Sequence, residues 1–110
     1  MICEPGDVVV VPFPFIDRRE AKRRPALVLS GRSFNEAGHS VLAMITTQSN
    51  PPWPGDTVIA DRDAAGLRVP CIVRIKVFTL DNRLILKKVG HLSPDDQARV
   101  GLRIRDHVTL

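Results

Sequence analysis

Cysteine is scarce in this sequence, and the two cysteines, Cys3 and Cys71, lie far apart. Neither belongs to a Cys pair or a Cys/His cluster with the spacing of a zinc site, so we expect free, partly buried thiols. No apolar stretch approaches the ~20 residues that a membrane-spanning helix needs. The segment from Met1 to Asp7 has neither the basic leader nor the apolar run of a signal peptide. We therefore expect a cytoplasmic protein without metal or cofactor.

Size and composition favour one globular domain. Hydrophobic residues make up 44% of the 110-residue chain and charged residues 25%, which is typical of a protein that buries a core and argues against disorder. Lys and Arg number 16 against 12 Asp and Glu, and the net charge of +4 favours polyanionic partners such as nucleic acid. We predict a single domain over residues 1–110, because one core organises a chain of this length.

Short apolar, β-branched segments separated by turn formers predict a mainly β protein. Prolines at positions 12 and 14 donate no ladder hydrogen bond, so the first strand should lie at a sheet edge or end there. A turn or short helix is expected around 33–37, a loop over 48–56, and turns over 61–67 and 81–83. The expected strands cover residues 8–15, 25–30, 40–47, 57–60, 71–80 and 84–90.

The sequence Ser93-Pro94-Asp95-Asp96 is typical of a helix start, with Ser as N-cap, Pro at the first helical position and acids near the positive end of the dipole. We expect this helix to run to about Asp106. Val100, Ile104 and Val108 recur every four residues and should form one stripe that packs on the sheet. The predicted architecture is a curled, mostly antiparallel barrel closed by a C-terminal helix.

The strand over 71–80 alternates between two faces, which predicts a half-buried strand that presents basic side chains. One face should carry Val73, Ile75 and Val77, and the other Arg74, Lys76 and Phe78. Phe13, Phe15 and Phe78 are assigned to the core or to a subunit interface.

Basic residues are concentrated over 17–24, which we interpret as a mobile hairpin loop. Lys22, Arg23 and Arg24 come immediately before a buried strand, and such rigid support suits residues that bind or catalyse. Pro25 biases Arg24 towards an extended backbone. The alternative is a solvated run of charge without a specific role.

Cleavage of RNA without a metal needs proton transfer at the 2′-OH and the 5′-oxygen, and positive charge facing the phosphorane. His39, His91 and His107 stand alone in the sequence, and a structural role is favoured for them. An arginine can supply fixed donors to phosphate oxygens, and a threonine hydroxyl a further hydrogen bond. Thr46 and Thr47, followed by Gln48, offer such hydroxyls at the end of a predicted core strand. Threonine is common at strand ends, so this feature alone is a weak signal.

Trp53 lies in the proline-rich segment that follows these threonines. An exposed indole at this place could stack on a nucleic-acid base. Equally, the ring could pack down as a lid over the barrel or join a dimer contact.

Several segments, in this order and with similar spacing, resemble the MazF/PemK endoribonuclease toxins over nearly the whole chain. The segments are Gly6-Asp7-Val8-Val9, Arg24-Pro25-Ala26-Leu27-Val28-Leu29-Ser30, Phe34-Asn35, Ile45-Thr46-Thr47-Gln48, Gly66-Leu67, Val73-Arg74-Ile75-Lys76-Val77-Phe78-Thr79-Leu80-Asp81 and Gly90-His91-Leu92.

The resemblance implies a mainly β fold: an SH3-like antiparallel β-barrel with short helices and a C-terminal helix. It implies a homodimeric toxin of a type II toxin–antitoxin system that cleaves single-stranded RNA without a metal and often at short sequence motifs. The products would be 2′,3′-cyclic phosphate and 5′-hydroxyl ends. It also implies a cognate antitoxin, whose acidic, disordered tail covers the RNA groove, and DNA binding by the complex of the two.

Carried over to this chain, the family's catalytic Arg and first hydroxyl fall on Arg24 and Thr46, and an Arg that some members use falls on Arg74. Two departures matter. First, many relatives have a Gly-Ser-Glu-Gln-like stretch before the Arg-Pro step, where this chain has residues 19–23; Glu20 is the candidate for the acidic residue, but its register is unsettled. Second, Lys76 stands where certain members have an acid, and we expect it to hold phosphate. The remaining predicted RNA-binding residues are Arg18, Lys22, Arg23, Thr47, Gln48 and Trp53.

Two other functions fit the same barrel. One is a non-catalytic inhibitor, because the fold also resembles that of toxins that poison DNA gyrase by binding alone. The other is a module that only holds RNA or an acidic protein tail.

Overall fold

The computed structural model describes residues 1–13 and 22–110. Its six strands form one antiparallel sheet in the order β4-β5-β3-β2-β1-β6. The strands are β1 (Asp7–Phe13), β2 (Lys22–Val28), β3 (His39–Thr47), β4 (Thr57–Val58), β5 (Cys71–Asp81) and β6 (Lys87–His91). The helices are α1 (Arg32–Asn35), α2 (Arg62–Ala65), the 3₁₀ turn η1 (Asn82–Leu84) and α3 (Pro94–His107).

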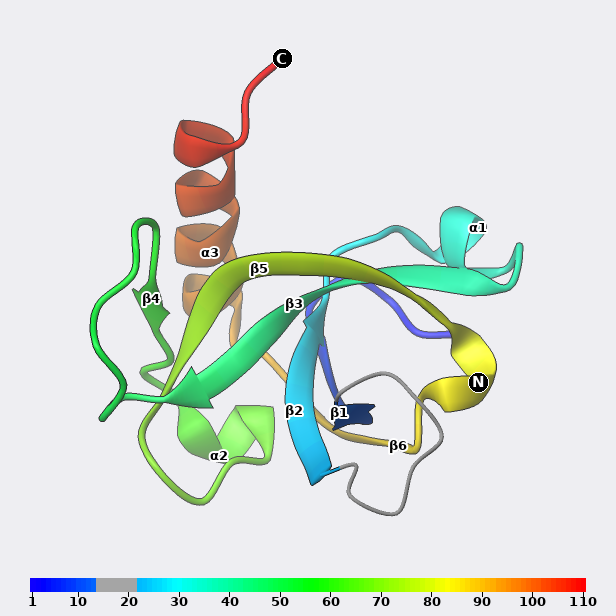
Figure 1. Ribbon diagram of the computed structural model, residues 1–110, viewed down its shortest axis with the longest axis horizontal. Coiled ribbons are helices and arrows are strands. Elements are labelled where there is room, and N and C mark those ends of the chain that lie inside the picture. Colours follow the sequence, from blue (N-terminus) through cyan, green and yellow to red (C-terminus); the bar gives the residue numbers. More distant parts are fainter. Residues whose placement is uncertain (14–21) are drawn as a thin grey trace.

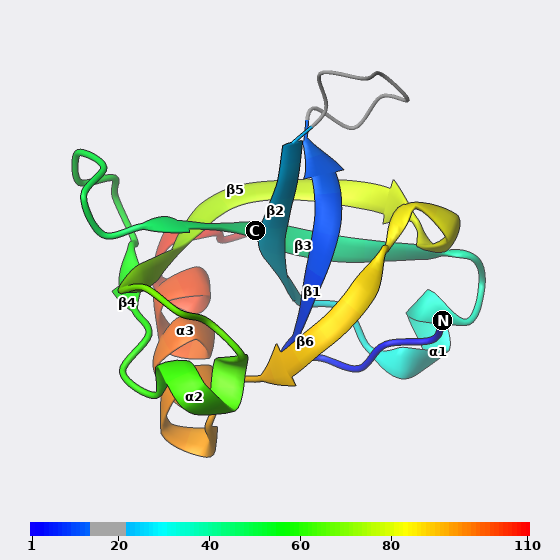
Figure 2. The ribbon, with the colours of Figure 1, turned by 90° about the horizontal axis from the view of Figure 1, so that it is seen from below.

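The sheet curls into a half-barrel, in which the long strands β3 and β5 cross over β1 and β2 (Figures 1 and 2). The prediction of a mainly β, antiparallel fold with short helices and a C-terminal helix is confirmed. β1 lies between β2 and β6, which excludes the first of the two alternatives, a strand at the sheet edge; the second holds, because β1 ends at Phe13, next to the prolines. Pro12 sits near the end of β1, opposite Arg23 of β2.

Two hydrophobic clusters lie on the two sides of the curled sheet, and neighbouring residues of one strand belong to different clusters. Successive side chains of a strand point to opposite faces, so a strand buried on both sides reads as a continuous apolar run. In β1, Val8 joins the cluster that includes Val100 of α3, whereas Val9 and Val11 join the other. This arrangement accounts for the unbroken run of valines in β1.

Helix α3 begins as its sequence predicts, because the Ser93 hydroxyl accepts a hydrogen bond from the backbone N–H of Asp96. Val100 is buried in the core and Ile104 packs against it. The prediction for Val108 is wrong: it caps the C-terminal end of the helix and is 57% exposed. The reason is visible in Figure 1, where the last turns of α3 extend beyond the sheet.

Two glycines allow α2 to lie directly against β6. Gly66 ends α2 with φ +72°, and a Cβ there would lie 2.1 Å from the carbonyl oxygen of Val89. A Cβ on Gly90 would lie 2.4 Å from the carbonyl carbon of Ala65. Any side chain at either position would therefore push the helix away from the strand.

Several local predictions need correction. Lys22, Arg23 and Arg24 belong to β2 and not to a loop, because they pair with the last residues of β1; positions 14–21 lie outside the described residues. Leu84 belongs to η1, so β6 starts later than predicted, and the segment 61–67 contains the short helix α2. The predicted helix at 33–37 appears as α1, and β3 is a central strand as expected.

Both cysteines are free and buried, and burial raises the pKa of each thiol. Within the described ranges, no helix has the length and apolar character needed to cross a bilayer.

Candidate functional site

Pairing of β2 with β3 brings Arg24 and Thr46 to the same place. The ladder between these strands runs from Val28 opposite Leu42 to Ala26 opposite Met44. Arg24 lies two residues before Ala26 in β2, and Thr46 two residues after Met44 in β3. Because the strands are antiparallel, both lie beyond the same end of the ladder and on the same face as Ala26 and Met44. Both line a hollow of about 280 Å³, whose other lining residues are Phe13, Met44, Asn50, Arg74 and Lys76.

This hollow shares residues with a second one, which in turn shares Thr47 and Val69 with a third. Arg24 and Thr46 also line the second, together with Arg68, and Thr47 and Gln48 line the third, together with Pro70. We call these three hollows the β2–β3 groove, because they follow the ends of those two strands. An extended, open depression of this kind suits an extended ligand better than a compact one.

Several cations in or next to the β2–β3 groove have no ion pair with a described residue. Arg24 is exposed, its guanidinium carbon lies 5.7 Å from the centre of the Phe13 ring, and no described side chain forms a hydrogen bond or ion pair with the guanidinium. The same lack of an ion pair with any described residue holds for Lys22, Arg23, Arg68 and Lys76, which are also exposed. Cations in this state can bind an anionic ligand without first breaking an ion pair with a described residue.

The hydroxyl of Thr46 is partly oriented by Asn50, whose side-chain amide donates to the Thr46 and Thr47 hydroxyl oxygens. A hydroxyl has two acceptor lone pairs and one proton, so the bond from Asn50 leaves the Thr46 proton available for another acceptor. Sequence reasoning missed Asn50. Its only signal was an amide in a turn, four residues after the threonine.

Arg74 is buried rather than presented to solvent, which corrects the prediction for β5. Its guanidinium donates to both carboxylate oxygens of Asp56, at 3.2 and 3.0 Å, and to the carbonyl oxygen of Pro51 at 2.7 Å. β5 also contains a bulge, in which Ile75 and Lys76 have no partner in β3. Val77 lies opposite Ala43 and Val73 opposite Ile45, so the two valines share a face as predicted, but Val77 is 49% exposed.

Trp53 combines features of both alternatives expected for it. Its ring packs against cationic side chains, with Lys76 Nζ at 4.6 Å and the Arg74 guanidinium carbon at 5.4 Å from a ring centre. The residue nevertheless remains 41% exposed. Trp53 thus stands beside the groove, against two of the residues that line it.

The three histidines lie away from the groove, in keeping with the structural roles favoured for them. His39 pairs with Asp81 at the opposite end of β3. The ring nitrogens of His91 contact the carbonyl oxygens of Leu92 and Pro5, and His107 contacts that of Arg103. No group of potential metal ligands occurs among the described residues.

Other predicted residues have mixed outcomes. Phe78 packs against the core as expected, whereas Phe13 lines the groove. Arg18, Glu20 and Phe15 lie outside the described residues.

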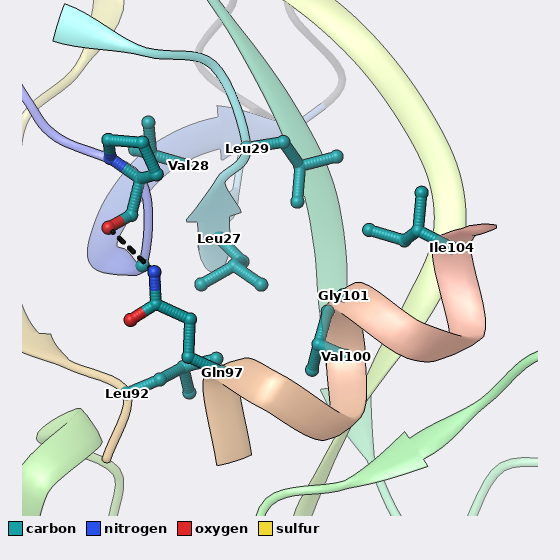
Figure 3. A pocket seen from close by; sticks show the side chains of 10 residues that line it. Leu27, Val28, Leu29, Leu92, Gln97, Val100, Gly101 and Ile104 are labelled. Atoms are coloured by element: carbon teal, nitrogen blue, oxygen red, sulfur yellow. Dashed lines mark hydrogen bonds between the residues drawn. The ribbon is translucent and has the colours of Figure 1, made fainter. Parts of the chain in front are cut away.

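A second depression, of about 210 Å³, separates α3 from the end of β2 (Figure 3). Leucines 27, 29 and 92, with Val100 and Ile104, give it an apolar lining, and Gln97 donates a hydrogen bond to the Pro5 carbonyl at its rim. Its lining includes no charged side chain from residues 1–13 and 22–110. It therefore lacks groups that could hold a phosphate, and the β2–β3 groove is the better candidate site.

A comparison against known protein families assigns nearly the whole chain to one family. Residues 4–108 match the family described as PemK-like, MazF-like toxin of type II toxin–antitoxin systems. The chain belongs to this family. No curated protein sequence matches it.

Solved structures of the family share the fold at low sequence identity. The MazE–MazF complex (Form-II) from Deinococcus radiodurans is 19% identical, with 100% of this chain and 98% of that chain covered and a TM-score of 0.76. An endoribonuclease in complex with its cognate antitoxin from a Mycobacterial species is 14% identical, with 94% and 92% covered and a TM-score of 0.75. The Mycobacterium tuberculosis toxin MazF-mt6 is 18% identical, with 91% and 93% covered and a TM-score of 0.72. The family fold expected from the sequence is thereby confirmed.

Proposed function

We propose that this chain is the toxin of a type II toxin–antitoxin system and acts as a metal-independent, sequence-specific endoribonuclease on single-stranded RNA. The observation that carries the proposal is the position of Arg24 and Thr46, which line one hollow of a groove whose cations Arg24, Arg68 and Lys76 have no ion pair with a described residue. The similar mycobacterial protein is described as an endoribonuclease, which supports the same activity here.

In the proposed reaction the ribose 2′-oxygen attacks the adjacent phosphorus, and the bond from phosphorus to the 5′-oxygen breaks. The 2′-OH gives up its proton, and the leaving 5′-oxygen takes one, so the products are a 2′,3′-cyclic phosphate and a 5′-OH. The Arg24 guanidinium would donate to the non-bridging oxygens and stabilise the charge that develops on the phosphorane. Thr46, with its proton left free by Asn50, would donate to the same phosphate.

Neither residue serves as the base in this scheme. A guanidinium stays protonated in proteins, so Arg24 cannot accept the 2′-proton. Among the described residues, no histidine or carboxylate lines the hollow that holds Arg24 and Thr46. The assigned task of both residues is therefore to bind and polarise the phosphate, and a role for Glu20 stays a prediction.

Neighbouring residues would bind the rest of the RNA. Lys22, Arg23 and Lys76 offer charge to flanking phosphates, and Arg18 stays a prediction of the same kind. Thr47 and Gln48 line the groove and carry donors and acceptors that can read base edges. Trp53 offers an aromatic surface for stacking.

The proposed partners follow from the same groove. Structures of similar proteins contain MazE–MazF and an endoribonuclease with its cognate antitoxin, so we infer a cognate antitoxin for this chain. An acidic segment would fit the cations around the groove and would compete with RNA for them. We also propose a homodimer, since apolar side chains such as Val77, Leu102 and Val108 are about half exposed in one copy.

The test is cleavage of single-stranded RNA by the purified protein in EDTA, followed by mapping of the ends. Arg24→Ala and Thr46→Ala are each expected to lower kcat by about 100-fold or more, the usual effect of removing one donor to a transition-state oxyanion. Circular dichroism and size measurement should show an unchanged fold and oligomer. Cleavage at the parental rate by both variants would mean that the site is misplaced.

The same assay separates the alternatives. Intact RNA together with stalled DNA gyrase would indicate a non-catalytic inhibitor, and RNA that is bound but not cut would indicate a binding module.

A further inference from the structure

The segment between β3 and β4 is tied to β5 by a buried ion pair. The side chains of Arg74 and Asp56 are only 11% and 16% exposed, and their closest charged atoms lie 3.0 Å apart. The two bonds between the guanidinium and the carboxylate fix their relative orientation as well as their distance. A fixed pair of this kind can hold a loop in one position.

Further bonds extend this pair into the loop. The backbone N–H of Trp53 donates to Asp56 Oδ2 at 2.9 Å, and Arg74 donates to the carbonyl oxygen of Pro51. Gly55, which lies between Trp53 and Asp56 in the chain and has φ +80°, approaches β5 so closely that a Cβ on it would lie 2.5 Å from Ile75 Cδ1. The loop on both sides of Trp53 is thus anchored to β5.

This anchoring determines where the indole stands. Trp53 packs over Arg74 and Lys76, which line the hollow that also holds Arg24 and Thr46. The ring is therefore held beside the hollow while a large part of it stays open to solvent. A base next to a phosphate bound in the hollow could reach it.

We propose that Asp56 is a positioning residue that, through Arg74, holds Trp53 as a stacking platform for one RNA base at the edge of the β2–β3 groove. Arg74 is on this view a scaffold for the loop and not a phosphate ligand, because Asp56 neutralises its charge and occupies its Nε and one terminal nitrogen. The inference rests on the proposed ribonuclease function and adds a base-binding subsite with its supporting residues.

Trp53 is the only tryptophan in the chain, so intrinsic fluorescence reports on this loop directly. Asp56→Asn preserves the shape of the side chain but removes the ion pair. Without RNA, the variant should show red-shifted emission and faster quenching by acrylamide than the parent. Asp81→Asn, which breaks the exposed pair between Asp81 and Arg83, is the matched control and should leave the emission unchanged.

Kinetics on single-stranded RNA test the function of the platform. Asp56→Asn should raise KM by roughly 5- to 150-fold, the range expected for loss of one base–aromatic stack, with kcat changed less than about twofold. Trp53→Ala should have the same effect, and the double variant should be no worse than either single one, because both changes remove one contact. If Asp56→Asn does not fold, Arg74→Lys, which keeps the charge but loses the two-pronged geometry, replaces it in both assays.

Two results would overturn the inference. One is a parental emission spectrum and KM in Asp56→Asn. The other is tighter RNA binding with a steeper salt dependence, which would identify Arg74 as a phosphate ligand that Asp56 had masked. Failure of the ribonuclease proposal looks different: the parent itself would cleave no RNA.

Discussion

Replacing Lys76 by Ala tests whether the charge around the β2–β3 groove contacts the RNA backbone. Each phosphate contact to a single strand contributes about 0.7 to the slope of log affinity against log salt, through release of a counterion. Three cations that have no ion pair with a described residue line the groove: Arg24, Arg68 and Lys76. If all three contact phosphate, the parental slope should be about −2.1, and Lys76→Ala should bring it to about −1.4.

The assay is fluorescence anisotropy of a labelled, cleavage-resistant oligonucleotide that lacks the 2′-OH, titrated at several NaCl concentrations. Lys76 also contacts the Trp53 ring, but loss of an aromatic contact weakens binding equally at all salt concentrations and leaves the slope alone. Arg105→Ala, an exposed change on α3, is the control and should not alter the slope. A slope that stays parental in Lys76→Ala, or falls as much in Arg105→Ala, would refute the assignment of charge to this groove.

Two predictions concern stability. Burial raises the pKa of Asp96, but hydrogen bonds from the backbone N–H groups of Asp61 and Ala60, together with the Arg99 guanidinium, outweigh it and hold the pKa below its usual value. The ionised form therefore stabilises the fold above its unfolded pKa of about 3.9, and this contribution is lost as pH falls through the folded pKa. Asp96→Asn should lower the free energy of unfolding at pH 7 by about 1–3 kcal/mol and flatten its acid dependence; an unchanged pH profile in urea titrations would contradict this. Gly66→Ala should lower the free energy of unfolding by more than about 1 kcal/mol, because the alanine would have to adopt a positive φ and its Cβ would lie 2.1 Å from the carbonyl oxygen of Val89. An unchanged Tm would contradict the described contact of α2 with β6.

Local chemistry made much of the fold predictable. β-branched runs mark strands because their side chains pack well on a pleated surface, and the Ser-Pro-Asp-Asp start marks α3 because each residue satisfies or complements a helix end. What failed depended on distant neighbours. Val108 continues the stripe of α3 in sequence, but the sheet does not extend far enough to cover it.

The site was predictable only in part. Resemblance to a family picked out Arg24 and Thr46, but their meeting depends on the register of β2 against β3, which turn residues do not determine for strands joined through a helix. The bulge at Ile75 and Lys76 could not be predicted, because the sequence of β5 alternates regularly through it. Asp56 lies 18 residues from Arg74, and no local pattern marks the two as partners.

The most direct test of joint action at one phosphodiester is the cleavage rate of the Arg24→Ala, Thr46→Ala double variant against both single variants. The substrate should be an oligonucleotide with a single cleavable ribonucleotide, so that kcat reports one bond. If both side chains act together on that phosphate, the double variant should be about as slow as the slower single variant. Losses that multiply, as they do for residues that act independently, would contradict the shared site.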